Sequence, residues 1–154
     1  MPTFKIESSF RQSETTSAFY VAAETADAAG AAYLASLNDG WREDYAVVSV
    51  VELDPQKTEG VVLVPLPAFL GTRDTAQRHL DIVGVPADVT RRRIVIDTTD
   101  VRAFAWSPCD ELIAELDRRG ATGVEVRGAG PYVQDRFRFV VDRRRLDEGF
   151  VTYA

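Results

Sequence analysis

The chain has 154 residues, of which 45% are hydrophobic and 27% charged, the composition of an ordinary globular domain. Without disulfides, neither half is long enough to build an ample core of its own, so we expect a single domain with one plausible internal boundary near 54–60. The net charge of −6 repels phosphate backbones, which disfavours nucleic acid as the main partner and favours a basic or neutral protein.

Several cellular classes are excluded or disfavoured by local features. The longest apolar run, Val61–Leu70, is broken by two prolines and is shorter than the ~20 residues that a membrane-spanning helix needs. The first residues, Met1–Glu7, lack the basic start and apolar core of a secretory signal. Cys109 is the one cysteine, so no intrachain disulfide can form. We therefore expect a cytoplasmic protein with no membrane segment.

The first third of the chain predicts a hairpin, a helix and a strand. Apolar and polar residues alternate in two segments on either side of a polar turn, which is typical of paired strands. A helix then starts after Thr25, whose hydroxyl is a good N-cap, and a β-branched apolar segment follows it. The predicted strands are Thr3–Phe10, Ala18–Ala23 and Tyr45–Leu53, and the predicted helix is Ala26–Leu37.

The remainder predicts two helices among further strands. Thr72 can cap a helix that ends at Gly84, and a better-defined helix runs from Ser107 to Arg119, with a proline in its first turn and glycine after its last. The predicted strands are Gly60–Val64, Arg92–Asp97, Thr122–Arg127 and Asp135–Val141, with a short edge at Phe150–Tyr153.

The expected order of elements is therefore β-β-α-β-β-α-β-α-β-β. Hairpin-length connections outnumber helical crossovers in this order, and hairpins join antiparallel strands. We expect an α+β single domain with a mixed or mainly antiparallel sheet and the helices on one face.

Cys109 is the first candidate for chemistry. It falls near the start of a predicted helix, where backbone N–H groups can lower the pKa of a thiol. It also lies on the apolar stripe with Leu112 and Leu116, and the neighbouring carboxylates Asp110 and Glu111 oppose thiolate formation. We favour a core role for Cys109.

His79 is the single histidine, so any histidine-dependent catalysis must use it. The helical pattern places it at the border between core and solvent. Asp97 and Asp100 flank the end of a strand, where acids and bases collect in α/β enzymes, but they also suit an N-cap and turn, which we favour. His79 has no closely spaced Cys or His beside it, so we predict neither a metal site nor a cofactor.

Two arginine-containing segments suggest binding. Arg127–Tyr132 is rich in glycine and can form an anion nest or a tight hairpin; a strand, not the helix of a phosphate loop, is expected after it. Asp135–Val140 alternates arginine with phenylalanine, which suits base stacking on a strand but also an ordinary half-buried strand. The predicted basic patch comprises Arg136, Arg138, Arg143, Arg144 and Arg145.

The leading functional hypothesis is a non-catalytic acidic protein-binding module of the inhibitor, immunity-protein, antitoxin or phage-modulator type. Its predicted interface is Trp41 and Tyr45 surrounded by Asp39, Glu43 and Asp44, although Trp41 can instead pack against the first helix, a role we consider the better supported. The alternatives are a structural subunit of a homo-oligomeric or virion-like assembly, and a small enzyme or ligand-binding domain that uses His79 with Asp97 or Asp100.

Overall fold

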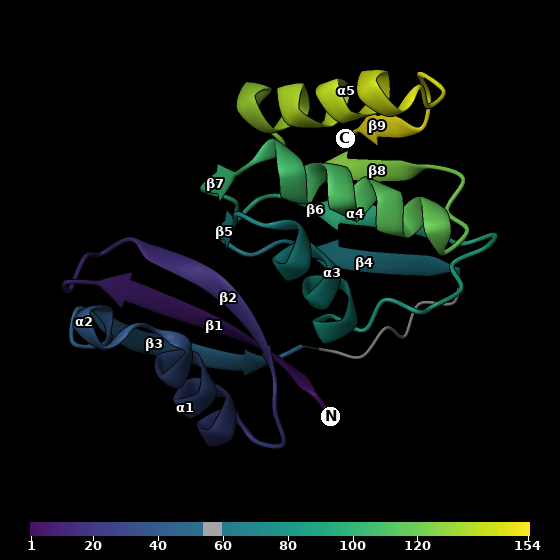
Figure 1. Cartoon of the computed structure of the whole chain (residues 1–154). Helices are drawn as coiled ribbons and strands as arrows, with labels where there is room; N and C mark the ends of the chain where they lie inside the picture. The colour runs from purple at the N-terminus through teal and green to yellow at the C-terminus, as the bar shows by residue number, and fades with distance from the viewer. Residues whose placement is uncertain (54–59) are drawn as a thin grey trace. The chain divides into compact units, whose positions relative to one another are not determined.

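The computed structural model of the chain describes residues 1–53 and 60–154, which form two compact units, Met1–Pro55 and Gln56–Ala154 (Figure 1). Helices are mixed with one antiparallel and two parallel sheets, which confirms the α+β fold class. The expected boundary at 54–60 lies outside the described residues except for Gly60. That the two units form one domain stays a prediction.

The first unit is a three-stranded antiparallel sheet with one long helix. Its strands lie in the order β2-β1-β3, and the short helix α2 leads into β3. The predicted hairpin and helix are therefore confirmed to within a few residues. The elements are β1 (Thr3–Phe10), β2 (Thr16–Ala22), α1 (Ala26–Ser36), α2 (Asp39–Arg42) and β3 (Tyr45–Glu52).

The core of this unit explains why the helix forms where it does. Thr25 accepts a hydrogen bond from the backbone N–H of Ala28, which caps α1. The helix packs its Tyr33 among Phe4 and Ile6 of β1, and the Tyr33 hydroxyl bonds Ser8 at 2.9 Å. An alanine-rich helix with a single large buried ring can thus lie close to the sheet.

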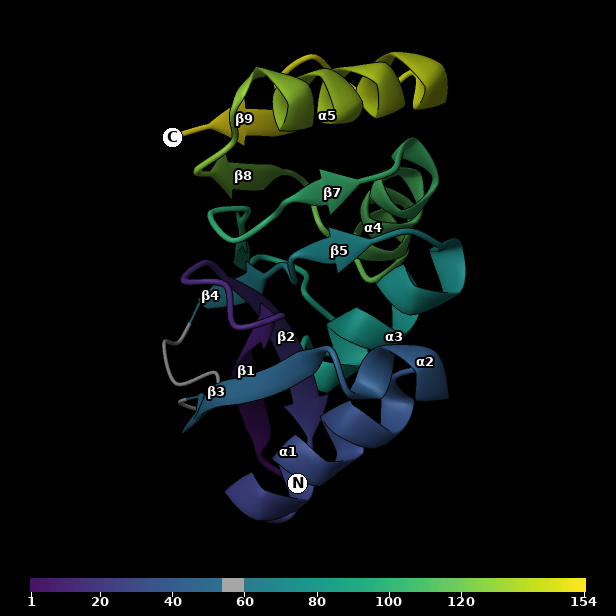
Figure 2. The same ribbon diagram turned by 90° about the vertical axis from the view of Figure 1, so that its left-hand side faces the viewer.

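The second unit is a parallel sheet in the order β4-β6-β8-β9, with a helix in each connection. Figure 2 shows α3, α4 and α5 on the same side of this sheet, as right-handed crossovers between successive neighbouring strands require. The strands are β4 (Val61–Pro65), β6 (Arg93–Asp97), β8 (Val124–Arg127) and β9 (Val151–Tyr153), and the helices are α3 (Arg73–Ile82), α4 (Trp106–Arg118) and α5 (Pro131–Arg144).

Two of the three connections each contain an additional short strand. After β4 the chain forms β5 (Phe69–Leu70), and after β6 it forms β7 (Ala103–Phe104); the two pair in parallel before α3 and α4 begin. Leu70 and Phe104 are buried, whereas Phe69 is exposed. The segment between β6 and α4 is therefore a turn followed by β7.

The predicted strand Asp135–Val141 is wrong, because these residues lie within α5. The alternation of arginine and phenylalanine covers only four positions. Val133, Phe137, Val140 and Val141 repeat at helical spacing and are buried, and Pro131 occupies the first turn, where proline is favoured. The connection to β9 is consequently a helical crossover, so this sheet is parallel.

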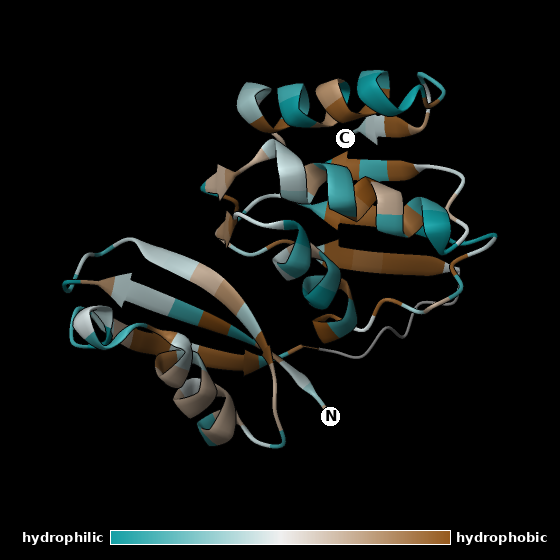
Figure 3. Ribbon diagram, in the orientation of Figure 1, coloured by the Kyte–Doolittle hydropathy of each residue, from teal (hydrophilic) through white to brown (hydrophobic). Residues whose placement is uncertain are grey.

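Hydrophobic residues concentrate in the strands of the second unit, as Figure 3 shows for β4, β6 and β8. Ile94 and Ile96 of β6 and Leu112 and Leu116 of α4 are almost inaccessible to solvent. The helices of the described residues are all too short or too polar to cross a membrane.

Candidate functional site

His79 is buried on α3 rather than placed at a border with solvent. Its Nε2 lies 2.5 Å from the carbonyl oxygen of Pro65, so Nε2–H is the donor and the ring fastens α3 to the end of β4. Burial lowers the pKa of His79 to about 4, and the hydrogen bond to Pro65 acts in the opposite direction. The imidazole is therefore neutral and directed at the protein backbone.

Asp97 is the last residue of β6, directly before a turn. Its Oδ1 accepts hydrogen bonds from the Thr99 N–H at 2.9 Å and from the Thr99 hydroxyl at 2.6 Å. Asp97 thus stabilises the turn before β7, and Asp100 lies further along that turn. His79 of α3 and Asp97 of β6 both lie near the carboxyl ends of the strands. The histidine is hydrogen-bonded to Pro65, and the aspartate is hydrogen-bonded to Thr99.

Cys109 is fully buried in the first part of α4. Burial, and to a smaller degree the charge of Asp110, raises the pKa of its thiol well above the usual value. This environment is that of a small core residue. Within residues 1–53 and 60–154, no three His, Cys, Asp or Glu side chains gather in a way that suits a metal ion.

The glycine-rich segment 127–130 connects β8 to the N-terminus of α5, not to a strand as expected. Gly128 has φ of +72°, and a Cβ there would lie 2.6 Å from Thr99 Oγ1. Thr98 donates from both its N–H and its hydroxyl to the carbonyl oxygen of Arg127. The segment therefore fastens the β6–β7 turn to the end of β8.

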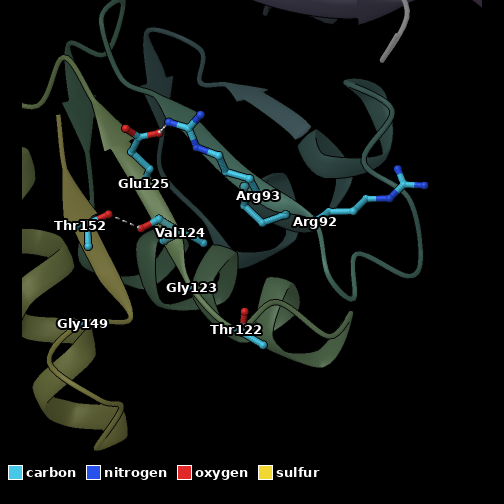
Figure 4. Close-up of a pocket in the computed structure, with 9 residues that line it drawn as sticks. Arg92, Arg93, Thr122, Gly123, Val124, Glu125, Gly149 and Thr152 are labelled. Carbon is cyan, nitrogen blue, oxygen red and sulfur yellow. Dashed lines mark hydrogen bonds and ion pairs between the residues drawn. The ribbon is translucent and has the colours of Figure 1, made fainter. Parts of the chain in front are cut away.

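An open pocket of about 420 Å³ lies at the opposite, amino edge of the sheet (Figure 4). Its lining includes Arg93 and Glu125, which form an ion pair of 2.5 Å, and the glycines Gly123 and Gly149. Ligands of α/β sheets usually bind at the carboxyl ends of the strands, and here Arg93 and Glu125 already pair with each other.

Three aromatic rings gather on the surface of the first unit. Phe10 lies 5.1 Å from Tyr45 and 6.2 Å from Trp41, measured between ring centroids. Trp41 packs against Phe10 and Tyr45 with tilted rings, and it is 50% exposed to solvent. We call these three rings with Asp39, Glu43 and Asp44 the acidic aromatic patch.

The carboxylates of the acidic aromatic patch are not equivalent. Asp39 is paired with Arg42 and Asp44 with Arg11, each at 3.3 Å. Glu43 is exposed, and no basic side chain of the described residues pairs with it. Glu43 therefore carries the one negative charge of the acidic aromatic patch that is not paired within the described residues.

A second exposed aromatic cluster lies on the second unit, along α5 and across the first turn of α4. Tyr132, Arg136, Phe139 and Arg143 follow one another at i, i+4, i+7 and i+11, which places them within about 60° on the helix. The Trp106 ring contacts Phe139 edge-on at 5.9 Å. We call these five residues together with Arg73 the arginine–aromatic surface.

Guanidinium groups cover the rings of this surface. Arg143 lies 5.1 Å from the centroid of Trp106, with Arg73 at 5.7 Å from the same ring, and Arg136 lies 4.6 Å from Tyr132. Arg73 also bonds Asp110 at 2.6 Å. In the described part of the chain, neither Arg136 nor Arg143 has a carboxylate within ion-pair distance.

Asp110 supports the arginine–aromatic surface from below. Its side chain is 4% exposed and receives two hydrogen bonds from Arg144, at 2.6 and 2.9 Å, besides the one from Arg73. The Arg144 hydrogen bonds hold the pKa of Asp110 below its usual value against the opposing effect of burial, and Arg73 adds to the lowering. The carboxylate thus joins α3, α4 and α5.

The predicted basic patch is divided by the helix. Arg136 and Arg143 lie on the arginine–aromatic surface, Arg144 points to Asp110, and Arg138 lies over the ring of Tyr153 on β9. Arg145 is the left-handed residue after the helix. Sequence reasoning missed Tyr132, Phe139, Trp106 and Arg73; the helical spacing of the first two on α5 was the available signal.

Comparison with models of protein families, with curated proteins and with solved structures found nothing that matches this chain.

Proposed function

We propose that this chain is a non-catalytic protein-binding module that docks a basic or neutral protein through the acidic aromatic patch. The observation that carries the proposal is the cluster of Phe10, Trp41 and Tyr45, in which Phe10 and Trp41 are exposed and Tyr45 is half-buried. Tryptophan and tyrosine at the centre of an exposed patch are the residues that most often dominate binding energy. An inhibitor, immunity protein, antitoxin or phage-encoded modulator acts by docking of this kind.

The charge of the first unit supports a basic or neutral partner. Residues 1–55 hold three Lys or Arg and nine Asp or Glu, which gives 3 − 9 = −6, whereas the second unit has fifteen of each and is neutral. Such an asymmetric field speeds the encounter with a basic surface and orients it toward the first unit. Glu43 is positioned to pair with a partner cation beside Trp41.

The surroundings of the chemical candidates support a binding role over the enzyme alternative. His79 is held by Pro65, Asp97 by Thr99, and Cys109 is buried with a raised pKa. Catalysis by a nucleophile and base needs the two groups within hydrogen-bond reach and accessible to substrate. A single buried cysteine without a disulfide also suits the reducing cytoplasm, where we propose that the module works.

The first step of the test identifies the partner by contact. A photo-crosslinking phenylalanine analogue in place of Trp41 should capture a protein in cells of the source organism. The same analogue at Val48, which is exposed on β3 away from the rings, is the control. A protein captured equally from both positions would contradict docking at the patch.

The second step measures the rate of association with the captured protein. Glu43→Lys/Asp44→Lys should slow association about tenfold at low ionic strength, because charge steering is lost. Glu24→Lys/Glu52→Lys makes the same charge change at the other end of the sheet, since Glu52 pairs with Phe4 and Tyr45 with Phe10. The proposal fails if the two double variants associate equally fast.

A further inference from the structure

The arginine–aromatic surface exposes aromatic rings that do not contribute to the buried face of α5. The helix buries Val133, Phe137 and Val140 against the rest of its unit. Tyr132 and Phe139 lie on another side and are 50% and 49% exposed. Exposed rings aligned along one side of a helix are typical of a surface that binds a partner.

The charges of this surface indicate the chemistry of the partner. Arg136 and Arg143 lie over the rings of Tyr132 and Trp106. Arg136 also donates from Nε to the Phe104 carbonyl and from Nη2 to the Tyr132 hydroxyl, which leaves its other N–H groups to face a partner. A stacked guanidinium still presents N–H groups at its edge, and these bind a carboxylate with two parallel hydrogen bonds. Since neither arginine has a carboxylate partner among the described residues, the surface is complementary to an acidic segment.

We infer that the arginine–aromatic surface is a second docking site, which binds an acidic amphipathic helix of a partner protein. Arg136 and Arg143 are seven residues apart on α5, or about 10 Å along its axis. Glutamates at i and i+7 of a second helix have the same separation. Leucine or phenylalanine at i+3 and i+4 of that helix would meet Phe139 and Trp106 between the two charges.

An acidic helix fits this surface better than a nucleic acid does. Base stacking on an Arg/Phe strand is not available, because the segment is helical and Arg138 lies over Tyr153 on another side of α5 from Arg136. The net charge of −6 repels a polyanion. Arg136 and Arg143, which have no carboxylate partner among the described residues, can neutralise two charges of a ligand. Two glutamates within a short helix match them in number.

This site is independent of the proposed function. It lies on the second unit, and the acidic aromatic patch lies on the first. The two surfaces also differ in the sign of their available charge. A protein with both sites could bring a basic and an acidic partner together.

The test uses Trp106 as its reporter. The chain has two tryptophans, so Trp41→Phe leaves Trp106 as the one source of tryptophan fluorescence. The probe is a stapled helical peptide with Glu at i and i+7, Leu at i+3 and i+4, and Ala elsewhere; the matched peptide has Gln in place of Glu. We expect saturable fluorescence change with the Glu peptide and at least about tenfold weaker binding of the Gln peptide.

Matched variants locate the binding. Arg136→Gln/Arg143→Gln should weaken binding of the Glu peptide about tenfold or more. Arg138→Gln/Arg145→Gln makes the same charge change on another side of α5 and just after its end, and it should weaken binding less than about twofold. Arg143→Gln alone keeps the Arg136 bond to the Phe104 carbonyl, which guards against an unfolded double variant.

Three outcomes would overturn the inference. These are equal binding of the Glu and Gln peptides, equal effects of the two arginine pairs, and tighter binding of a single-stranded oligonucleotide than of the Glu peptide. Glu43→Lys/Asp44→Lys tests the other surface, and its effect on the captured partner is measured separately. The two proposals are therefore tested independently, and failure of one does not affect the test of the other.

Discussion

Each unit of the molecule carries one tryptophan on its surface, and the two surroundings differ in how charge is arranged. Trp41 is 50% exposed and Trp106 is 38% exposed, and both contact other rings. Around Trp41 the arginines are paired with Asp39 and Asp44. Around Trp106 the charge of Arg143 has no carboxylate partner among the described residues. Exposed rings alone do not indicate the charge of a partner, whereas a charged side chain without a counterion does indicate it.

The two surfaces also differ in the length of the helix that carries the tryptophan and in the buried contacts beneath it. Trp41 belongs to α2, which has four residues and no buried side chain. Trp106 opens a helix of thirteen residues, and Arg73, which covers its ring, is bonded to the buried Asp110. Substitutions beneath the arginine–aromatic surface should therefore alter stability, whereas substitutions in the acidic aromatic patch should alter mainly binding.

The largest effect is expected from Asp110→Ala. Removal of this carboxylate leaves Arg73 and Arg144 without their common partner. The loss of one member of a buried ion pair costs ~3–5 kcal/mol, and we expect the lower end of that range because both arginines are partly exposed to water. The free energy of unfolding from urea titration measures it. Asp135→Ala removes the exposed partner of Arg138 and should cost less than about 0.5 kcal/mol. Similar losses for both variants would show that Asp110 is not a support.

The next effect is the pH dependence that His79, the one histidine of the chain, contributes to the second unit. Its pKa is about 4 in the folded protein, against ~6.5 when unfolded, so the unfolded state binds the proton first. The free energy of unfolding should fall by ~3 kcal/mol as the pH is lowered from about 6.5 to about 4. His79→Gln should flatten this slope in urea titrations of the Trp41→Phe protein; an unchanged slope would contradict it.

A smaller effect is expected where the turn after β6 meets the segment before α5. Gly128→Ala places a Cβ against Thr99 at a positive φ, which should cost ~2 kcal/mol. Gly71→Ala is the control, since its Cβ meets nothing within 4 Å, and it should change stability by less than about 0.5 kcal/mol. Equal thermal midpoints for both variants would exclude a fastening role for Gly128.

The sequence predicted a helix or strand correctly where its end signals and its apolar face indicate the same element. The helix at α4 was predictable because Pro108, its apolar stripe and Gly120 all indicate the same bounds. The α5 segment was not, because a four-residue alternation competed with a helical stripe that starts at Val133. Strand direction followed from that error, since a helix in place of a strand converts a hairpin into a crossover.

The candidate site depended more on tertiary structure. Trp41 and Tyr45 could be selected from sequence because they are close in the chain, whereas Phe10 joins them only through the pairing of β1 with β3. Likewise, Arg73 and Trp106 meet because α3 and α4 begin side by side after β5 and β7. No spacing in the sequence contains that contact.

The smallest expected effect compares the two tryptophans directly. Trp106→Ala removes the ring contact with Phe139 and the stacking of Arg73 and Arg143, which should cost ~1.5 kcal/mol. Trp41→Ala removes contacts of a more exposed ring on a four-residue helix and should cost less than about 1 kcal/mol. Urea titration followed by circular dichroism measures both without a tryptophan signal. If Trp41→Ala proves the more costly, the acidic aromatic patch is a structural cluster of its unit, and its rings are exposed for a reason other than docking.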